Sequence, residues 1–316
     1  MRNFEIGAND AGQRLDKYLK KLLPNASTGF LYKMLRKKNI TLDGKKATGK
    51  ELLKSSSTVT VFFSEETLLK FMQNTDELKA EYERLKTLPM KGLHVIYEDD
   101  DTLAADKPEN MLSQKAKPDD ISANEYLLGY LIRSHSLSFE DFLTFRPSVC
   151  NRLDRNTTGL LLMGKSLKGS QDLSEGLRDR SIRKYYRAMV YGTVTEPAHL
   201  SGWLKKDVKT NKVQVLDHEE TDAVKIETKY RPVSIEKNST MLEIHLITGK
   251  THQIRAHLAS IGHPVIGDMK YGNAAVNKKY YEDFHVNHQL LHAYRLEFPG
   301  GRVITAPLPR VFQQLH

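Results

Sequence analysis

The residues best suited to chemistry lie in a short segment, residues 151–159, with the sequence Asn-Arg-Leu-Asp-Arg-Asn-Thr-Thr-Gly. One carboxylate, Asp154, is flanked by Arg152 and Arg155 and is followed by a turn. The apolar run 160–164 then predicts a buried strand. A loop held by a rigid scaffold is a frequent place for a catalytic acid. The pattern also fits an acid that only caps or pairs a surface loop, so the residues alone leave both interpretations open.

Two later segments carry further candidate residues. Residues 184–192 alternate as a strand and place Tyr186 on one of its faces, where core packing is the alternative to a functional role. Residues 242–258 predict a strand, a Thr-Gly turn and a helix that starts near Thr251. A helix N-terminus behind such a turn, together with Lys250, is expected to form a phosphate cradle.

Other chemistries fit these segments poorly. Residues 249–251 resemble the end of a P-loop, but Ile244 occupies the position of its first glycine. His252 and His257 are five residues apart, which does not suit a zinc pair on one helix. The acidic run 98–101 has no alternating ligand spacing and predicts a solvated hairpin turn. We therefore expect no metal and no other cofactor.

The basic charge is concentrated at the N-terminus. The chain has 316 residues, enough for two domains, and a net charge of +9. Residues 1–63 carry +8 of this charge, so the rest of the chain is nearly neutral at +1. A basic module on a neutral body predicts a polyanionic partner, RNA or DNA. Membrane lipid is the competing polyanion, but no lipidation motif or basic amphipathic anchor supports it.

The expected location is the cytoplasm. The N-terminus has no apolar signal region, and no apolar run approaches the length that spans a bilayer. Cys150 is the single cysteine and cannot form an intrachain disulfide, which fits a reducing compartment. Cys150 neighbours the acidic motif, but we expect it to be a small buried residue at a strand end and not a nucleophile.

Residues 1–63 have the pattern of a small basic domain. An amphipathic helix over residues 14–23 is followed by a second helix that starts near Ser27 or Thr28 and is closed by Asn39. A hairpin turn at residues 43–44 and a strand at residues 58–62 complete the module. Its most concentrated cations, which alternatively form only a solvated face, are Lys33, Arg36, Lys37 and Lys38.

The remaining chain predicts a charged, helical linker and an α+β body. The linker covers residues 64–91, and the body covers residues 92–316. Within the body, strands are expected at 93–97 and 102–105. The latter is followed by a turn that ends in Lys-Pro at residues 107–108. The body also has helical patterns over residues 121–143 and 166–180.

Three separated motifs resemble those of the RluA-type pseudouridine synthases. Residues 151–159 are similar to the family signature His-Arg-Leu-Asp-x-x-Thr-Ser-Gly, with Asn151 in place of His and Thr158 in place of Ser. Residues 184–192 match Lys-x-Tyr-x-Ala-x-Val-x-Gly. Residues 248–258 match Thr-Gly-Arg-x-His-Gln-Ile-Arg-x-His-Leu, with Lys in place of the first Arg. The module 1–63 resembles the S4-type RNA-binding domain, although Asn39 stands where Gly is usual.

The resemblance implies specific roles for these residues. Asp154 maps onto the family's catalytic aspartate, Tyr186 onto its active-site tyrosine, and Arg255 onto the arginine that pairs with the aspartate and keeps it ionised. Arg152 is expected either to fill the space left by a flipped base or to hold phosphate. Lys250 and His252, like the four N-terminal cations, are expected to contact RNA, where the cations neutralise phosphates. Whether the aspartate attacks C1′, abstracts a proton from C2′ or adds to the uracil ring is left open.

The resemblance also implies the fold and the function. It predicts an α+β pseudouridine synthase fold with a central mixed, mostly antiparallel sheet and an active-site cleft, preceded by the small S4-type domain. The implied activity is conversion of specific uridines to pseudouridine by a monomeric enzyme. Large-subunit (23S) ribosomal RNA is the expected substrate. The alternatives are a tRNA-specific synthase and a non-catalytic RNA-binding or ribosome-assembly protein.

Overall fold

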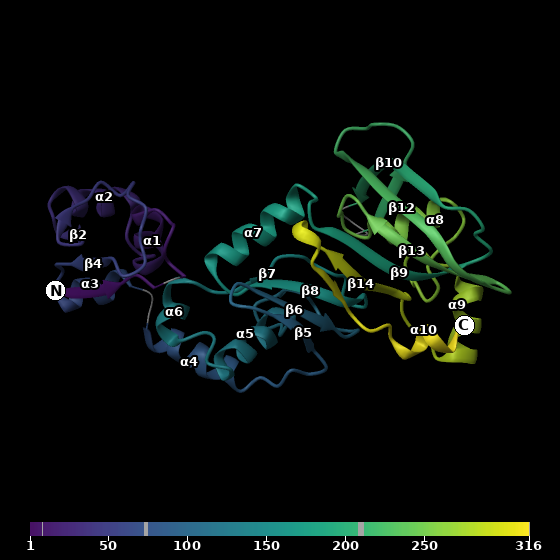
Figure 1. The fold of residues 1–316 in the computed structure, drawn as a ribbon, viewed down its shortest axis with the longest axis horizontal. Helices are drawn as coiled ribbons and strands as arrows, with labels where there is room; N and C mark the ends of the chain where they lie inside the picture. The colour runs from purple at the N-terminus through teal and green to yellow at the C-terminus, as the bar shows by residue number, and fades with distance from the viewer. Residues whose placement is uncertain (8, 73–74, 208–211, 316) are drawn as a thin grey trace.

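The computed structural model describes residues 1–7, 9–72, 75–207 and 212–315, which form two separately packed parts (Figure 1). In the N-terminal part, two helices pack on a four-stranded sheet with the strand order β1-β4-β2-β3. Asp43 and Gly44 have φ angles of 49° and 73°, as a two-residue hairpin turn of type I′ requires. The predicted helices and hairpin are therefore confirmed. The elements are β1 (Arg2–Glu5), α1 (Leu15–Leu22), α2 (Thr28–Arg36), β2 (Ile40–Leu42), β3 (Lys45–Lys46) and β4 (Thr58–Val61).

The end of α2 differs from the prediction. Lys38, with a φ of 59°, takes the left-handed conformation that had been assigned to Asn39. The N–H of Asn39 donates to the Met34 carbonyl at 2.9 Å, and the N–H of Lys38 donates to the Leu35 carbonyl at 3.1 Å. These two bonds form a Schellman motif, which places the left-handed residue at Lys38, one position before the Asn39 that the residue type suggested.

The segment 64–91, predicted as a helical linker, contains α3 (Glu65–Phe71) and α4 (Thr75–Lys86). Leu68 packs in the N-terminal core, whereas Leu85 packs in the main core of the body. The two cores therefore divide within this segment, while the domain boundaries at residues 63 and 91 stay predictions. A direct contact also joins the two parts, because the Thr144 hydroxyl donates to the Asp10 carboxylate at 2.6 Å.

The described strands of the body form one eleven-stranded sheet. Its main path runs β11-β10-β12-β13-β9-β14-β8-β6-β5, with β15 beside β14 and β7 beside β8. Among the described pairs only β14–β8 is parallel, so the expected mixed, mostly antiparallel sheet is confirmed. The strands are β5 (His94–Glu98), β6 (Thr102–Lys107), β7 (Ser148–Val149), β8 (Thr158–Gly164), β9 (Arg183–Tyr191), β10 (Ala198–Asp207), β11 (Lys212–Leu216), β12 (Ala223–Glu236), β13 (Ser239–Leu246), β14 (Leu291–Glu297) and β15 (Val303–Thr305).

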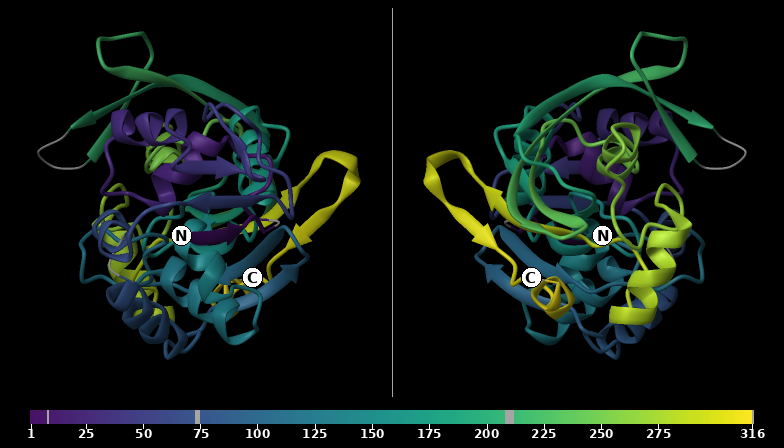
Figure 2. Two further views of the ribbon diagram at one scale, coloured as in Figure 1. Left: turned by 90° about the vertical axis from the view of Figure 1, so that its left-hand side faces the viewer. Right: turned by 90° about the vertical axis from the view of Figure 1, so that its right-hand side faces the viewer.

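Helices lie along both faces and at the ends of this sheet (Figures 1 and 2). They are α5 (Ala123–Arg133), α6 (Phe139–Thr144), α7 (Leu167–Arg178), α8 (Gln253–Ser260), α9 (Ala274–Phe284) and α10 (Arg310–Gln314), with a 3-10 turn at Pro299–Gly301. Two predicted boundaries were wrong. The strand expected to end at Ala105 continues to Lys107, and the helix expected to start near Thr251 begins at Gln253. No helix among the described residues is long and apolar enough to cross a membrane.

Strand β8, which follows the acidic motif, is buried on both faces. Leu161 and Met163 belong to the core that includes α5, whereas Leu160 and Leu162 belong to the core that includes α7. This two-sided burial explains the continuous apolar run. At its start, Gly159 has a φ of 109°, and a Cβ there would lie 2.2 Å from the carbonyl oxygen of Ala293 on β14. Glycine thus lets β14 pair directly behind the loop that carries Asp154.

Asp106 on β6 gives a test of this packing. Its Oδ1 is buried without a hydrogen-bond partner among the described residues, and burial raises its pKa from 3.8 to about 6. Because the pKa is raised by folding, stability present below pH 4 is lost as the pH rises from about 4 to about 6. We expect Asp106→Asn to raise the free energy of unfolding at pH 7 by roughly 2 kcal/mol. Urea unfolding at pH 4 and pH 7 measures this difference, and an equal effect at both values would contradict it.

Candidate active site

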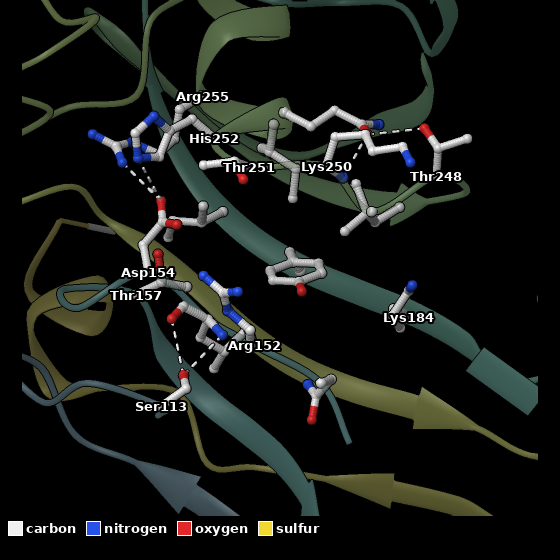
Figure 3. A pocket seen from close by; sticks show the side chains of 18 of the residues that line it. Ser113, Arg152, Asp154, Thr157, Lys184, Thr248, Lys250, Thr251, His252 and Arg255 are labelled. Atoms are coloured by element: carbon white, nitrogen blue, oxygen red, sulfur yellow. Dashed lines mark hydrogen bonds and ion pairs between the residues drawn. The ribbon is translucent and has the colours of Figure 1, made fainter. Parts of the chain in front are cut away.

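The loop that carries Asp154 is fixed to its surroundings through its backbone. The N–H of Leu153 donates to the Ser113 hydroxyl at 2.9 Å, and that hydroxyl donates to the Leu153 carbonyl at 2.9 Å. The N–H of Thr157 donates to the Asp154 carbonyl at 3.0 Å and closes the turn. These contacts leave the Asp154 side chain, 27% exposed, pointing into a cavity (Figure 3).

Lys107 anchors the other side of the same loop. It is fully buried, and its Nζ donates to the carbonyls of Pro108, Met111 and Arg155 at 2.8–2.9 Å. Burial lowers the pKa of Lys107 to about 7, against the opposing effect of the Asp154 charge. The sequence predicted only a turn that ends in Lys-Pro after the strand 102–105, with no role for this lysine. A lysine separated by one residue from the apolar run 103–105 was the available signal.

The carboxylate of Asp154 is bound by Arg255, as expected from the motifs. Nη1 of Arg255, on α8, donates to Oδ2 of Asp154 at 2.7 Å. The same guanidinium donates through Nε and Nη2 to both oxygens of Asp268, at 2.6 and 2.8 Å. Arg255 is 7% exposed and Asp268 is fully buried. A bidentate contact of this kind fixes the plane of the guanidinium, so that its third nitrogen is aimed at Asp154.

Asp268 is a site residue that the sequence analysis missed. Burial alone would raise its pKa, but the hydrogen bonds and charge of Arg255 and the backbone N–H groups of Lys270 and Tyr271 hold the pKa below its usual value. These two N–H groups donate to Oδ1 at 2.8 and 3.1 Å. Asp268 is therefore an ionised counter-charge to Arg255 at neutral pH. The conspicuous Gly-Asp pair at residues 267–268 was the only sequence signal for it.

His252 lies next to the acid. It has a φ of 54°, its Nδ1 is 3.0 Å from the Tyr271 hydroxyl, and its Nε2 is 4.0 Å from Oδ2 of Asp154. Burial lowers the pKa of His252 below its usual value despite the nearby Asp154 charge. A neutral imidazole at neutral pH does not neutralise phosphate, and its expected contact with RNA stays a prediction.

Tyr186 occupies the wall of the same cavity. It lies on β9, is 6% exposed, and shares a core face with Ala188 and Val190, as alternation predicted. Burial and the charge of Asp154 raise its pKa, so the phenol stays protonated. The tyrosine thus packs in the core through its ring while lining the cavity, and the two interpretations left open by the sequence are compatible.

The cavity itself is large and basic. Its volume is about 1250 Å³, above the usual range for a small-molecule site and ample for a nucleotide with its neighbours. Among the described residues, Asp154 is the only carboxylate that lines it. The Lys and Arg side chains in the lining are Arg152, Arg155, Arg178, Arg180, Lys184, Lys206, Lys225, Lys250 and Arg255. The nearly neutral charge of the body in the sequence concealed this concentration of cations.

The other predicted binding residues divide between two places. Arg152 and Lys250 line the cavity, whereas Lys33, Arg36, Lys37 and Lys38 are exposed on the N-terminal part and lie outside it. The phosphate cradle expected at the turn before α8 lacks one donor, because the N–H of Lys250 is bound by the Gln253 side chain at 3.1 Å.

The two departures from the family signature do not touch Asp154. The Asn151 amide donates to the Leu160 carbonyl at 3.1 Å and accepts from the Leu162 N–H at 2.7 Å, so it ties the motif to β8. The Thr158 hydroxyl lies 2.8 Å from Nδ1 of His292.

Cys150 is partly buried, and burial raises its pKa, which argues against a nucleophile. No cluster of potential metal ligands occurs in the described part of the chain.

This geometry suits covalent or base chemistry by a carboxylate. Asp154 is accessible from a cavity, is held by one guanidinium, and faces a space lined by a protonated phenol and many cations. An ionised carboxylate in such a place can act as a nucleophile or a general base on a polyanionic substrate.

The buried Arg255–Asp268 pair gives a prediction. Asp268→Asn keeps the shape of the side chain but leaves the buried guanidinium with a single carboxylate, and breaking such a pair costs roughly 3 kcal/mol or more. We expect the free energy of unfolding to fall by about that amount, measured by urea titration. The control is Asp283→Asn at an exposed position of α9, which should have little effect. Equal losses in both variants would contradict the prediction.

Comparison with known proteins indicates which reaction the protein carries out. The family model described as RNA pseudouridylate synthase matches residues 101–260. A ribosomal large subunit pseudouridine synthase D of Nitrosomonas europaea is 29% identical, covering 95% of this chain and 83% of that relative. A ribosomal large subunit pseudouridine synthase C of Rickettsia typhi is 30% identical, covering 83% of each chain.

A solved structure agrees at the level of the fold. Human RNA pseudouridylate synthase domain containing 4 superposes with a TM-score of 0.57 at 20% identity, covering 74% of this chain and 95% of that one. The matched range 101–260 contains Asp154, Tyr186 and Arg255. The chain therefore belongs to the RNA pseudouridylate synthase family and is an RNA pseudouridine synthase, an isomerase that acts on RNA.

Proposed function

We propose that this synthase modifies uridine in the RNA of the large ribosomal subunit, with Asp154 as its catalytic carboxylate and the N-terminal part as an S4-type RNA-binding domain. The observation that carries the catalytic assignment is the 2.7 Å contact between Asp154 and a guanidinium fixed by Asp268, at the wall of a basic cavity. The choice of RNA rests on the names of the relatives from Nitrosomonas europaea and Rickettsia typhi.

The reaction requires few groups. The bond between N1 of uracil and C1′ of ribose breaks, the base turns, and a bond forms between C5 and C1′. C5 then loses its proton and N1 gains one, so the composition is unchanged. The target nucleotide must leave its stack to reach Asp154. The cavity holds the base and limits access of water to the opened sugar.

The residues around Asp154 have distinct roles in this proposal. Asp154 acts on the reacting nucleotide, and Arg255 holds its carboxylate in one orientation through the 2.7 Å hydrogen bond. Tyr186 supplies a flat ring to the cavity and a protonated hydroxyl at neutral pH. Arg152 is exposed at the cavity without a hydrogen bond or ion pair among the described residues, which leaves its guanidinium available to RNA.

The N-terminal part would dock the RNA at a distance from the chemistry. Lys33, Arg36, Lys37 and Lys38 are all exposed at the end of α2, where they can neutralise phosphates without contacting bases. A cytoplasmic location fits a ribosomal substrate and a chain with one cysteine. A monomeric state and the lack of a membrane partner stay predictions.

Asp154→Asn tests the catalytic assignment. The amide keeps the shape of the side chain but removes the charge, so we expect the rate of tritium release from C5-labelled uridine to fall at least about a thousandfold. Fragments of large-subunit ribosomal RNA and tRNA are compared as substrates, with Asp283→Asn as the control variant. Release by Asp154→Asn at the wild-type rate would contradict the catalytic role, and release from tRNA alone would contradict the ribosomal assignment.

Neutralising the N-terminal cations tests the docking role. In the full chain, changing Lys33, Arg36, Lys37 and Lys38 to Gln should weaken RNA binding and reduce the slope of log K against log salt by about 0.7 for each phosphate that these side chains no longer neutralise. Four exposed lysines elsewhere, changed to Gln together, serve as the control: Lys79, Lys86, Lys278 and Lys279. Equal slopes in the two variants would show that the basic charge of the N-terminal part does not dock RNA.

A further inference from the structure

We propose that Lys184 forms a phosphate subsite inside the active-site cavity, which binds the RNA backbone next to the target uridine. This inference rests on the proposed function, because it takes the nucleotide that reacts with Asp154 as its reference point. It assigns a ligand class, a phosphodiester of the substrate strand, to a part of the cavity that the chemistry at Asp154 does not use.

Lys184 is placed on the same face of β9 as Tyr186. The two residues are separated by one position of a strand, so their Cα atoms lie roughly 7 Å apart along it. Both line the cavity, and Figure 3 shows Lys184 on the side of the cavity away from Asp154 and Arg255. A group bound at Lys184 is therefore displaced along the strand from a base that contacts Tyr186.

The ammonium group of Lys184 lacks the partners that a buried cation normally has. It is half-buried, and the described residues offer its Nζ neither a hydrogen bond nor an ion pair. Burial, and next the positive charge of Arg180, lower the pKa of Lys184, with no acidic group opposing them. A desolvated cation among like charges is unfavourable unless an anion joins it, and a substrate can supply that anion.

The surroundings leave room for that anion. A Cβ built at Gly249 would lie 3.4 Å from Nζ of Lys184, so the absence of a side chain at Gly249 keeps the space beside the ammonium free. Lys250 follows directly and also lines the cavity, as does Arg180. A phosphate among Lys184, Arg180 and Lys250 would meet three cations, and Asp154, the only carboxylate described in the lining, lies on the other side of the cavity (Figure 3).

Binding a phosphate explains Lys184 better than a part in the conversion of uridine to pseudouridine would. Making pseudouridine needs no second cation at the reacting carbon, and Asp154 already has its own guanidinium. RNA brings one phosphate with every nucleotide, and a lysine binds it as a point charge that needs no strict geometry. The subsite would hold the strand while the neighbouring base enters the cavity, which fixes the position of the uridine by its backbone.

The test compares Lys184→Met with Lys184→Arg on a short RNA that the wild-type enzyme modifies. Met removes the charge and keeps the length of the side chain, so we expect KM to rise about tenfold with kcat nearly unchanged, as for the loss of one charged hydrogen bond. Arg should restore most of the affinity. The matched control is Lys229→Met, at an exposed position of β12, which should behave as wild type.

A second measurement identifies the phosphate without relying on the variant alone. Each phosphate near the target uridine is replaced in turn by a neutral methylphosphonate. With the wild-type enzyme, one position should raise KM about as much as Lys184→Met does. At that position the Lys184→Met variant should lose nothing further, since the two changes remove the same interaction.

The outcomes separate this proposal from the proposed function. If the wild-type enzyme converts no uridine of ribosomal RNA, the proposed function fails, and the comparison is made on the RNA that is converted. If activity is intact but Lys184→Met has the KM of Lys229→Met, the phosphate subsite is wrong. A fall in kcat at constant KM, or additive effects at every methylphosphonate position, would likewise overturn it.

Discussion

The site depends on a single guanidinium that is shared by two carboxylates. Arg255 lies in a core where an unpaired charge would be strongly unfavourable, and the fully buried Asp268 balances it through two hydrogen bonds. This pair is complete without Asp154, so the third nitrogen is held in place before any substrate arrives. In the catalytic role proposed for Asp154, an acid bound by a pre-oriented donor would need little reorganisation during the reaction. The buried Arg255–Asp268 pair therefore fixes the orientation of the Asp154 carboxylate.

The loop of Asp154 has to meet that guanidinium from a different part of the chain. Its backbone is fastened by Ser113 and, through the carbonyl of Arg155, by the buried ammonium of Lys107. Gly159 brings the loop directly against β14, since any side chain there would collide with the Ala293 carbonyl. Three short contacts from three segments therefore set the position of one carboxylate. Such convergence explains why the motif alone, a turn with an acid, was compatible with an ordinary surface loop.

Features that depend on neighbouring residues could be predicted from the sequence, whereas features that depend on residues far apart in the chain could not. The alternation of β9 placed Tyr186 correctly, and the two-sided burial of β8 was visible in its apolar run. Local turn chemistry was less reliable. The left-handed residue after α2 is Lys38 and not Asn39, because the bond to the Met34 carbonyl decides its place. Asp268 and Lys107 had only weak local signals, a Gly-Asp pair and a lysine just beyond an apolar run, since their roles exist only through partners distant in sequence.

Charge shows the same dependence on three-dimensional arrangement. Counting residues assigned nearly all of the excess charge to the N-terminal part, yet nine Lys and Arg side chains of the body line one cavity, against a single carboxylate, Asp154, among the described residues. Net charge governs the long-range attraction of RNA, whereas the local field in the cavity acts only on a strand that has already arrived. The exposed cations on α2 would then act first on the RNA, and the cations of the cavity would act on it afterwards. Since the field of the cavity is screened within about 10 Å at 0.1 M salt, the proposed docking by a separate basic part and the proposed capture of one nucleotide would be physically distinct steps.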